Sequence, residues 1–525
     1  MHHNTQTEHY NNQTKSVHEK HDSAIYKFSK AFSNRVNSQL SRLSLTKPQQ
    51  HSTPVSPAVN LPTELLLAIF RLVYNQQRTS RYSFHHDKPP KVIWKHEEPL
   101  LPTLFPFALA AVCCRWCDVL AGVPEYWTRM VVLVDENPTD TITITSCLQW
   151  SGDLPLSVTI TRANLDPSQH DEGELQRSRI VYDLHRPHLA RIESLTVSVL
   201  HSSALPDIFT DLDGPAGQIE TLKLVNVVDD DFTVTKRTSP KSKGPLDAPL
   251  LDALTIRGHC FRDKLLGNSL QTSRLINLTS ISIAGYRPPD GSTEGLHLWM
   301  TLQTLGQLPR LDDLTLADIR FDANRRRYTG PPISLPRLHT VAFEKLASVD
   351  LKDIHSIIEG IHLSSTIITD CTVETFTNIN STDYLTFERM SRQDLTLVLD
   401  SWFGYVLTLR GSTCVDNQFF REMARDLASA PGGTSYFAAP NLKEVVITNC
   451  DRFSLPALRH WIQQRRRSNA VSSIRDVHVS GRGPAITEEY AEWFRENLEM
   501  FTWNTVQSDG KRYRVDAYSS RVYVI

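Results

Sequence analysis

Two segments near the start of the chain carry apolar residues at helical spacing. The first follows Pro62, which suits the opening turn of a helix because its missing N–H costs no hydrogen bond there. Its apolar positions, three or four residues apart, are Leu65, Leu66, Ile69, Phe70 and Val73. Those of the second segment are Leu109, Val112, Cys113, Trp116, Val119 and Leu120. Short helices cannot bury this much apolar surface among themselves, so we expect them to pack on another domain or on a partner.

A second pattern, apolar-x-x-apolar-x-apolar, recurs through the rest of the chain. Its middle positions from Leu195 to Val341 are separated by 27, 32, 27, 33 and 27 residues. The gap from Val341 to Val445 is 104 residues, which leaves room for about two further units. Val406–Leu409 is one candidate strand there and Thr372–Phe376 a weaker one. The eight units are Ile192/Leu195/Val197, Ile219/Leu222/Leu224, Leu251/Leu254/Ile256, Leu278/Ile281/Ile283, Leu311/Leu314/Leu316, Leu338/Val341/Phe343, Leu442/Val445/Ile447 and Ile474/Val477/Val479.

Helical patterns lie between these strands, at residues 298–305, 351–361 and 455–462. A strand and a helix repeated at this period are typical of a leucine-rich-repeat solenoid, an α/β fold with a parallel sheet. Such repeats also carry Asn or Cys three residues past the third apolar position, and here only Cys450 fits. We therefore predict degenerate repeats. The alternative is a mixed α/β domain in which the spacing is a coincidence.

Further elements flank the repeats. A strand at residues 130–134, a helix at 139–150 and a strand at 154–160 are expected before them. After them we predict a helix at residues 486–498 with Thr487 as its N-cap, a turn at 508–510, and strands at 513–515 and 522–525 that would cap the last repeat.

The first 58 residues are rich in His, Asn, Gln, Ser and Thr, and we expect most of them to be disordered. Residues 24–45 are an exception, because apolar residues recur there at helical spacing and no acidic residue falls between Ile25 and Thr46. One interpretation is a basic amphipathic helix that lies on a membrane surface or on a partner. The other, which we prefer, is a marginal helix in a flexible tail.

Composition narrows the function classes. The net charge of −2 gives no global argument for nucleic acid or membrane binding. No apolar run approaches the length of a transmembrane helix, and the start of the chain lacks the apolar core of a signal peptide. Eight cysteines in 525 residues, without a pattern, indicate reduced thiols. We expect a cytoplasmic or nuclear protein.

No catalytic motif stands out. A phosphate-binding glycine loop and a Gly-x-Ser-x-Gly elbow are both missing from the sequence. Cys113, Cys114 and Cys117 resemble metal ligands, but no second Cys or His pair follows at finger spacing, which favours structural cysteines. Arg325–Arg327 and Arg465–Arg467 could bind a phosphate or an acidic peptide, although solvated loops often carry such runs. We predict no catalytic residue, no cofactor and no metal.

The first two segments together resemble the F-box family, and fungal F-box proteins in particular. The opening Leu-Pro-x-Glu-Leu-Leu-x-x-Ile-Phe matches residues 61–70, and Leu-x-x-Val-Cys-x-x-Trp matches residues 109–116. The segment at residues 75–103 is longer than the family usually has, and its His85–Lys91 stretch is expected to be an exposed loop. The alternative is an ordinary amphipathic helical hairpin. The resemblance implies that the following residues bind an adaptor: Leu61, Pro62, Leu65, Leu66, Ile69, Phe70, Leu109, Val112, Cys113, Trp116 and Trp127.

The resemblance also implies a function. F-box proteins hold a Skp-type adaptor, which connects them to cullin and RING subunits of a ubiquitin ligase, while a repeat domain holds the target. The expected domains are a tail at residues 1–58, an F-box at 59–128 with its loop at 75–103, and a solenoid at 129–525. This chain would be a non-catalytic substrate receptor that binds no nucleic acid. The alternative is a repeat scaffold that binds the adaptor without forming a ligase.

Side chains alternate along a strand, so residues beside the apolar positions should form the open sheet face. In five successive units these residues are mostly small or polar. Small side chains leave room for a partner to reach the sheet, and scattered charges can orient it. The alternative is a solvated face without a ligand. The candidate target-binding charges are Lys223, Arg257, Asp313 and Glu344.

Overall fold

A computed structural model describes much of the chain from Leu61 onwards. The described residues are 61–81, 91–95, 100–101, 104–208, 212, 216–230, 248–268, 272–287, 295–322, 333–358, 363–373, 382–428, 438–507, 509–515 and 522–524. The predicted tail at 1–58, its segment 24–45, the loop 85–90 and Arg325–Arg327 lie outside them. The described chain is mixed α/β and falls into two compact units, divided between Leu251 and Asp252.

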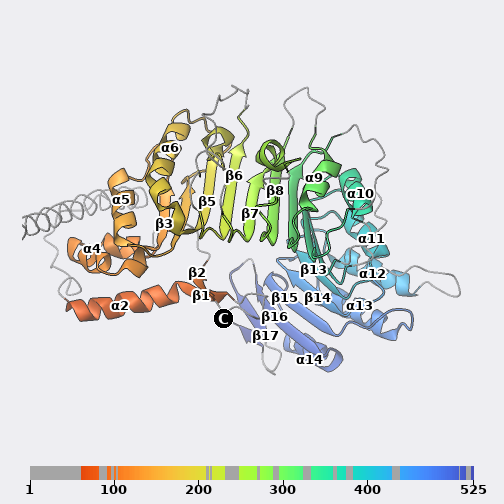
Figure 1. Cartoon of the computed structure of the whole chain (residues 1–525). Helices are drawn as coiled ribbons and strands as arrows, with labels where there is room; N and C mark the ends of the chain where they lie inside the picture. Colours follow the sequence, from red (N-terminus) through yellow and green to blue (C-terminus); the bar gives the residue numbers. More distant parts are fainter. Residues whose placement is uncertain are drawn as a thin grey trace, which may run out of the picture. The chain divides into compact units, whose positions relative to one another are not determined.

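The first unit begins with helices and continues with a parallel sheet (Figure 1). Its sheet has the order β6-β5-β4-β3, and the four strands run parallel. The helical elements are α2 (Thr63–Gln76), α3 (Phe107–Ala110), α4 (Cys114–Ala121), η2 (Pro124–Trp127), α5 (Thr141–Trp150), α6 (Glu174–His185), η3 (Arg186–Arg191) and η4 (Ser202–Ala204). The strands are β1 (Arg78–Arg81), β2 (Lys91–Trp94), β3 (Arg129–Leu133), β4 (Leu156–Thr161), β5 (Ile192–His201) and β6 (Thr221–Val228).

Local sequence explains where several helices begin. Pro62 is the N-cap of α2, one position before the helix, and Glu64 places a negative charge in its first turn. The side chain of Asp140 accepts a hydrogen bond from Ile142 N at the start of α5. Thr487 caps α14 (Glu488–Asn497) in the same way, as predicted.

The second apolar segment is not one continuous helix. It divides into α3 and α4, because Cys113 has extended backbone angles, φ −165° and ψ 165°. The 75–103 segment also differs from the expected loop. Its first two residues finish α2, and β1 and β2 pair as an antiparallel hairpin.

The second unit is a longer ladder of parallel strands with an antiparallel end. Strands β7 to β16 run parallel in chain order, and β17 and β18 are antiparallel. The strands are β7 (Ala253–Arg257), β8 (Ser280–Tyr286), β9 (Asp313–Ile319), β10 (Thr340–Glu344), β11 (Ser365–Thr369), β12 (Tyr384–Glu388), β13 (Val406–Arg410), β14 (Glu444–Thr448), β15 (Asp476–Arg482), β16 (Met500–Val506), β17 (Arg512–Val515) and β18 (Tyr523–Val524).

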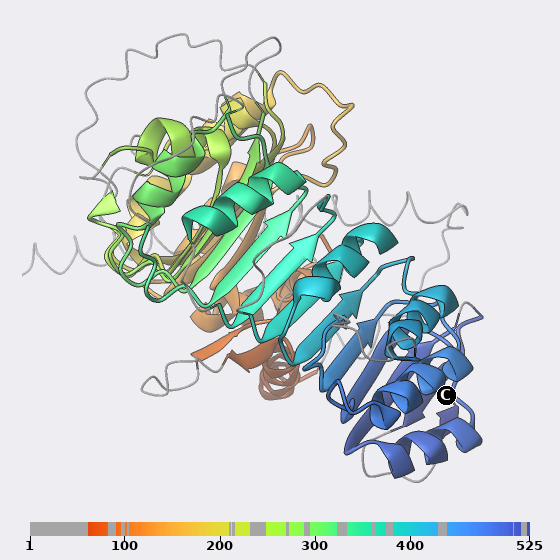
Figure 2. The same cartoon turned by 90° about the vertical axis from the view of Figure 1, so that its right-hand side faces the viewer.

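Helices line one face of this second sheet, as Figure 2 shows. They are α7 (Gly258–Cys260), η5 (Phe261–Leu265), α9 (Leu298–Leu305), α10 (Ser348–Ile357), α11 (Arg392–Ser401), α12 (Asn417–Ala428), α13 (Leu455–Arg467) and α14. The apolar residues of each strand are buried towards this layer, whereas the residues between them are half-buried or exposed on the other face. In the described part of both units, no helix is long and apolar enough to cross a membrane.

The repeat positions align across neighbouring strands. Leu254 pairs with Ile281, Ile281 with Leu314, and Leu314 with Val341, so the middle apolar residues form one continuous row. Each is almost fully buried. The eight predicted units therefore all coincide with strands of the structure.

Where the structure describes the interval between Val341 and Val445, it contains three strands, whereas two were predicted. Val406–Leu409 does lie in a strand, β13. Of the candidate at residues 372–376 only Thr372 and Val373 are described, and they follow the end of β11 at Thr369. Thr366 and Leu385 are the middle residues of these two strands and align with Val341 and Leu407. Both side chains are buried.

Each strand from β8 to β15 ends in the same backbone turn. The residue two places past the third apolar position has a positive φ, a region that L-residues other than Gly, Asn and Asp rarely adopt. The eight residues are Gly285, Asp318, Lys345, Asp370, Arg389, Gly411, Asn449 and Gly481. A shared turn at a fixed offset shows that these units repeat in conformation as well as in apolar pattern.

Candidate functional site

Large aliphatic side chains are exposed along one side of α2 and in the segment before α4. Exposed fractions are 51% for Leu65, 40% for Ile69, 65% for Leu72 and 51% for Val112. We call these four residues the α2 patch. An exposed cluster of large aliphatic side chains is typical of a protein-binding surface.

The opposite side of α2 faces the interior of the first unit. Leu66, Phe70 and Tyr74 recur every four residues and are almost fully buried. The ring of Phe70 meets that of Trp116 edge to face, with 5.2 Å between their centroids. Arg115 Nη2 donates a 2.6 Å hydrogen bond to the carbonyl oxygen of Leu61. These contacts hold α2 against α4.

The eleven predicted adaptor-binding residues therefore separate into three groups. Pro62, Leu65, Ile69 and Val112 are exposed, and Leu61, Leu109, Cys113 and Trp116 are half-buried. Leu66, Phe70 and Trp127 are buried, which corrects the expectation that they contact a partner directly. Leu66 and Phe70 lie on the inner side of α2, whereas Trp127 packs against Trp150 of α5.

Trp127 connects the helical segment to the sheet of the first unit. Its indole Nε1 donates a 2.9 Å hydrogen bond to Leu120 O, and its ring lies 4.5 Å from that of Trp150 in α5. Because Trp127 is fully buried, the C-terminal end of α4 is packed directly against the first strand-and-helix unit.

The β1–β2 hairpin contributes a residue that the sequence analysis missed. Trp94 lies 5.3 Å from Tyr74 and 6.2 Å from Phe105 between ring centroids, and Arg129 lies over its ring at 5.7 Å. Lys95 N also bonds Gln77 O at 2.9 Å. The described part of the insert is thus tied to α2 by aromatic packing.

The predicted target-binding charges lie on strands of both units. Lys223 is exposed on β6 of the first unit. In the second unit, Arg257, Asp313 and Glu344 are half-buried. Burial raises the pKa of Asp313 above its ordinary value, while a hydrogen bond from Thr340 opposes the shift. Glu344 lies 3.7 Å from Arg389 and 3.8 Å from Lys345, so its charge is already balanced.

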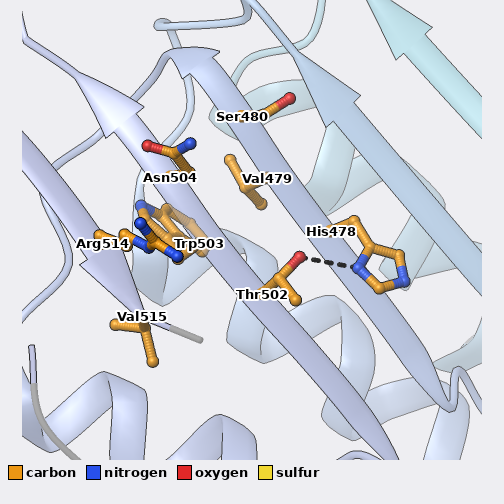
Figure 3. Close-up of a pocket in the computed structure, with 8 residues that line it drawn as sticks. All are labelled: His478, Val479, Ser480, Thr502, Trp503, Asn504, Arg514 and Val515. Atoms are coloured by element: carbon orange, nitrogen blue, oxygen red, sulfur yellow. Dashed lines mark hydrogen bonds between the residues drawn. The ribbon is translucent and has the colours of Figure 1, made fainter. Parts of the chain in front are cut away.

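A cavity of about 470 Å³ opens on the last strands of the second unit. Figure 3 shows its lining on β15, β16 and β17, with the polar side chains of His478, Ser480, Thr502, Asn504 and Arg514 around it. His478 Nδ1 and Thr502 Oγ1 share a 2.8 Å hydrogen bond. His478 Nε2 lies 3.8 Å from Glu444 Oε1. None of these residues was predicted from the sequence to form a site.

The predicted arginine run at residues 465–467 has one buried and two exposed members. Arg465 is buried, and its guanidinium donates to the carbonyl oxygens of Ser472, Ala438, Ala439 and Pro440. Burial lowers its pKa to about 10. It is therefore not available to bind a phosphate or peptide from solution, whereas Arg466 and Arg467 are exposed.

The Cys113–Cys117 group shows no metal-site geometry. Cys114 is exposed and Cys117 is buried, and burial raises the pKa of the Cys117 thiol to about 12. Throughout the described residues, no three His, Cys, Asp or Glu side chains are grouped to hold a metal ion.

No protein-family model matches the chain, and no curated protein matches it.

Proposed function

We propose that this chain is an F-box substrate receptor. In this proposal the α2 patch binds a Skp-type adaptor, the adaptor brings cullin and RING subunits, and the repeat units hold a target protein. The observation that carries it is the exposure of Leu65, Ile69, Leu72 and Val112 on a helix that the family motif begins.

Burial of the four exposed side chains by a partner would stabilise the complex. Full burial of one large aliphatic side chain is worth roughly 1.5–3 kcal/mol. A partner that covers the α2 patch would therefore gain enough to anchor an interface at a few residues. Leu66 and Phe70 are fixed beneath the patch, so little ordering would be required when the partner binds.

The second part of the proposal is that the strands are degenerate leucine-rich repeats. Cys450 stands three residues past the third apolar position, and its Sγ donates to Leu409 O at 3.8 Å and Thr448 O at 3.5 Å. Cys371 has the same offset in the repeat that sequence analysis missed. Its Sγ donates to Phe343 O at 3.6 Å and Thr369 O at 3.3 Å. Two cysteines thus make equivalent bonds to equivalent carbonyl groups, as a repeat requires.

In this proposal the chain catalyses no step and acts by bringing the target close to the enzyme. Holding a target next to a charged ubiquitin carrier raises the effective concentration of its lysines. The receptor binds the adaptor at one surface and the target at another, and it sets the distance between them. Ubiquitin transfer occurs on the other subunits.

Co-purification tests this function. The full chain should capture the Skp-type adaptor together with cullin. Adaptor without cullin would favour a non-ligase scaffold, and capture of neither would contradict the proposal.

A further inference from the structure

One transverse row of polar side chains crosses five neighbouring strands of the second unit. The strand register pairs Arg410 with Thr448, Thr448 with Ser480, Ser480 with Asn504, and Asn504 with Arg514. We call these five residues the arginine row. Thr448 Oγ1 and Ser480 Oγ lie 3.1 Å apart in a hydrogen bond, which confirms that neighbouring members share a face.

The arginine row lies on the open face of the sheet. The residue beside each member within its strand is buried towards the helices, because side chains alternate along a strand. These buried neighbours are Leu409, Ile447, Val479, Trp503 and Val515. The row itself is half-buried or exposed, with Arg410, Asn504 and Arg514 the most open members.

The five members of the row include two cations and no acid, and the next residue across the sheet from Arg410 is Glu388 on β12, which is ion-paired with Arg389. Arg410 is exposed, and so is Arg482, which lies further along β15. By contrast, the acidic side chains of Glu344 and Glu388 on β10 and β12 both lie beside Arg389. A surface on which cations outnumber acids attracts and orients an acidic partner.

The cavity lies within the row and suits hydrogen bonding to anionic oxygens. Three members of the row, Ser480, Asn504 and Arg514, line it together with His478 and Thr502. Hydroxyl, amide and guanidinium groups all donate hydrogen bonds, and a guanidinium can hold a carboxylate with two of them.

The dimensions of the row fit an extended peptide. Neighbouring strands are about 4.8 Å apart, so four steps from β13 to β17 span about 19 Å. An extended chain rises about 3.3 Å per residue, so about six residues would cover the row.

We propose that the arginine row binds an extended acidic peptide segment of the target. The inference rests on the proposed function, because it assigns the target's docking segment within the repeat units. An acidic side chain would enter the cavity beside Arg514, and a second would lie near Arg410. Bases of single-stranded nucleic acid usually stack on aromatic side chains, but the row contains none and Trp503 is fully buried beneath it.

The first experiment uses the full chain and fluorescently labelled six-residue peptides in an anisotropy titration. A peptide that alternates Glu and Gly should bind, and the same peptide with Gln in place of Glu should bind at least tenfold more weakly. Binding should weaken when salt rises from about 0.05 M to about 0.5 M, because screening shortens the reach of the charges. A third peptide carries phosphoserine in place of Glu. If it binds more tightly than the Glu peptide, the row prefers a phosphate; if it binds more weakly, the row prefers a carboxylate.

The second experiment uses matched charge reversals. Arg410→Glu with Arg514→Glu should weaken binding of the Glu peptide at least tenfold. Arg310→Glu with Arg337→Glu makes the same charge change at exposed positions before β9 and β10, and should leave binding unchanged. Arg410→Gln with Arg514→Gln should weaken binding too and keeps the test available if the reversal impairs folding.

Several results would overturn the proposal. Equal binding of the Glu and Gln peptides, or an equal effect of both reversals, would remove the row as an acidic-peptide site. Tighter binding of a labelled oligothymidylate than of any peptide would reassign the face to nucleic acid. Adaptor capture is measured on the same variants. A variant that still captures the adaptor but no longer binds the peptide supports the row. If the unmodified chain captures no adaptor, the proposed function fails, but the peptide-binding result still tests the row.

Discussion

Phe70 and Trp116 pack edge to face at 5.2 Å, one from each of the two apolar segments near the start of the chain. Ile69, next to Phe70 on α2, is exposed, and so is Val112 in the segment before α4. Substitutions one position apart on α2 should therefore have different consequences, because one residue holds the helix and the other offers a surface.

The first prediction separates these two roles by stability. Phe70→Ala should lower the free energy of unfolding by about 3–5 kcal/mol, since it removes a fully buried aromatic ring. Ile69→Ala should change it by less than about 1 kcal/mol, because Ile69 is largely open to solvent. Urea unfolding measures both. Equal destabilisation would show that the two sides of α2 are assigned incorrectly.

The second prediction concerns the insert. Replacing residues 82–90 with a short Gly/Ser bridge should leave adaptor binding and stability nearly unchanged, because lengthening or shortening a connecting loop costs little. Trp94→Ala should destabilise the unit by about 3 kcal/mol or more, because its ring packs against Tyr74 and Phe105. Loss of adaptor binding in the shortened variant alone would make the loop part of the interface.

The third prediction is a loss of stability in mild acid. His185 and His355 are buried in separate units, and burial lowers the pKa of each from 6.5 to about 4. The folded state favours the neutral ring, so their contribution is complete above pH 6.5 and is lost as the pH falls from 6.5 towards 4. Each should account for about 2 kcal/mol of destabilisation between pH 7 and pH 5.

Denaturant unfolding at the two pH values measures this slope, with one histidine replaced at a time. His355→Leu should reduce the pH dependence of the second unit, because it removes the buried ring that must stay neutral in the folded state. An unchanged slope in His355→Leu would mean that another group takes up the protons.

The fourth prediction uses the adjacent arginines of α13. Arg465→Ala should cost about 3–5 kcal/mol, because the buried guanidinium satisfies several carbonyl groups that would lose their donor. Arg467→Ala should stay within about 0.5 kcal/mol, since that side chain is exposed. Thermal unfolding of the pair checks it, and a small effect at Arg465 would show that water replaces its hydrogen bonds.

The strands could be predicted where the alternation of apolar residues was regular. Strands β11 and β12 were missed for two physical reasons. Thr366 occupies a buried middle position with a polar side chain, and the steps from Val341 to Thr366 and on to Leu385 shrink to 25 and 19 residues. The predicted units are 27 to 33 residues apart, so steps this short fall outside the pattern. Cys371 follows this missed pattern, so it was not recognised as the counterpart of Cys450.

The candidate sites were less predictable than the strands. Leu65 and Leu66 are equally apolar, and only the packing of Phe70 on Trp116 shows which side of α2 turns inward. The arginine row joins residues that are 24 to 38 positions apart on successive parallel strands, from Arg410 to Asn504. A signal did exist: Arg410, Thr448 and Ser480 each follow the third apolar residue of their unit.

The most direct measurement of the central claim is a titration of purified Skp-type adaptor into the full chain by calorimetry. The unmodified chain should form a one-to-one complex, and Leu65→Ala with Ile69→Ala should weaken it at least tenfold while the chain stays folded. Ile142→Ala with Ile180→Ala removes two exposed isoleucines elsewhere in the first unit and should bind as the unmodified chain does. No binding by the unmodified chain, or unchanged binding by the Leu65/Ile69 variant, would contradict the assignment of the α2 patch as an adaptor site.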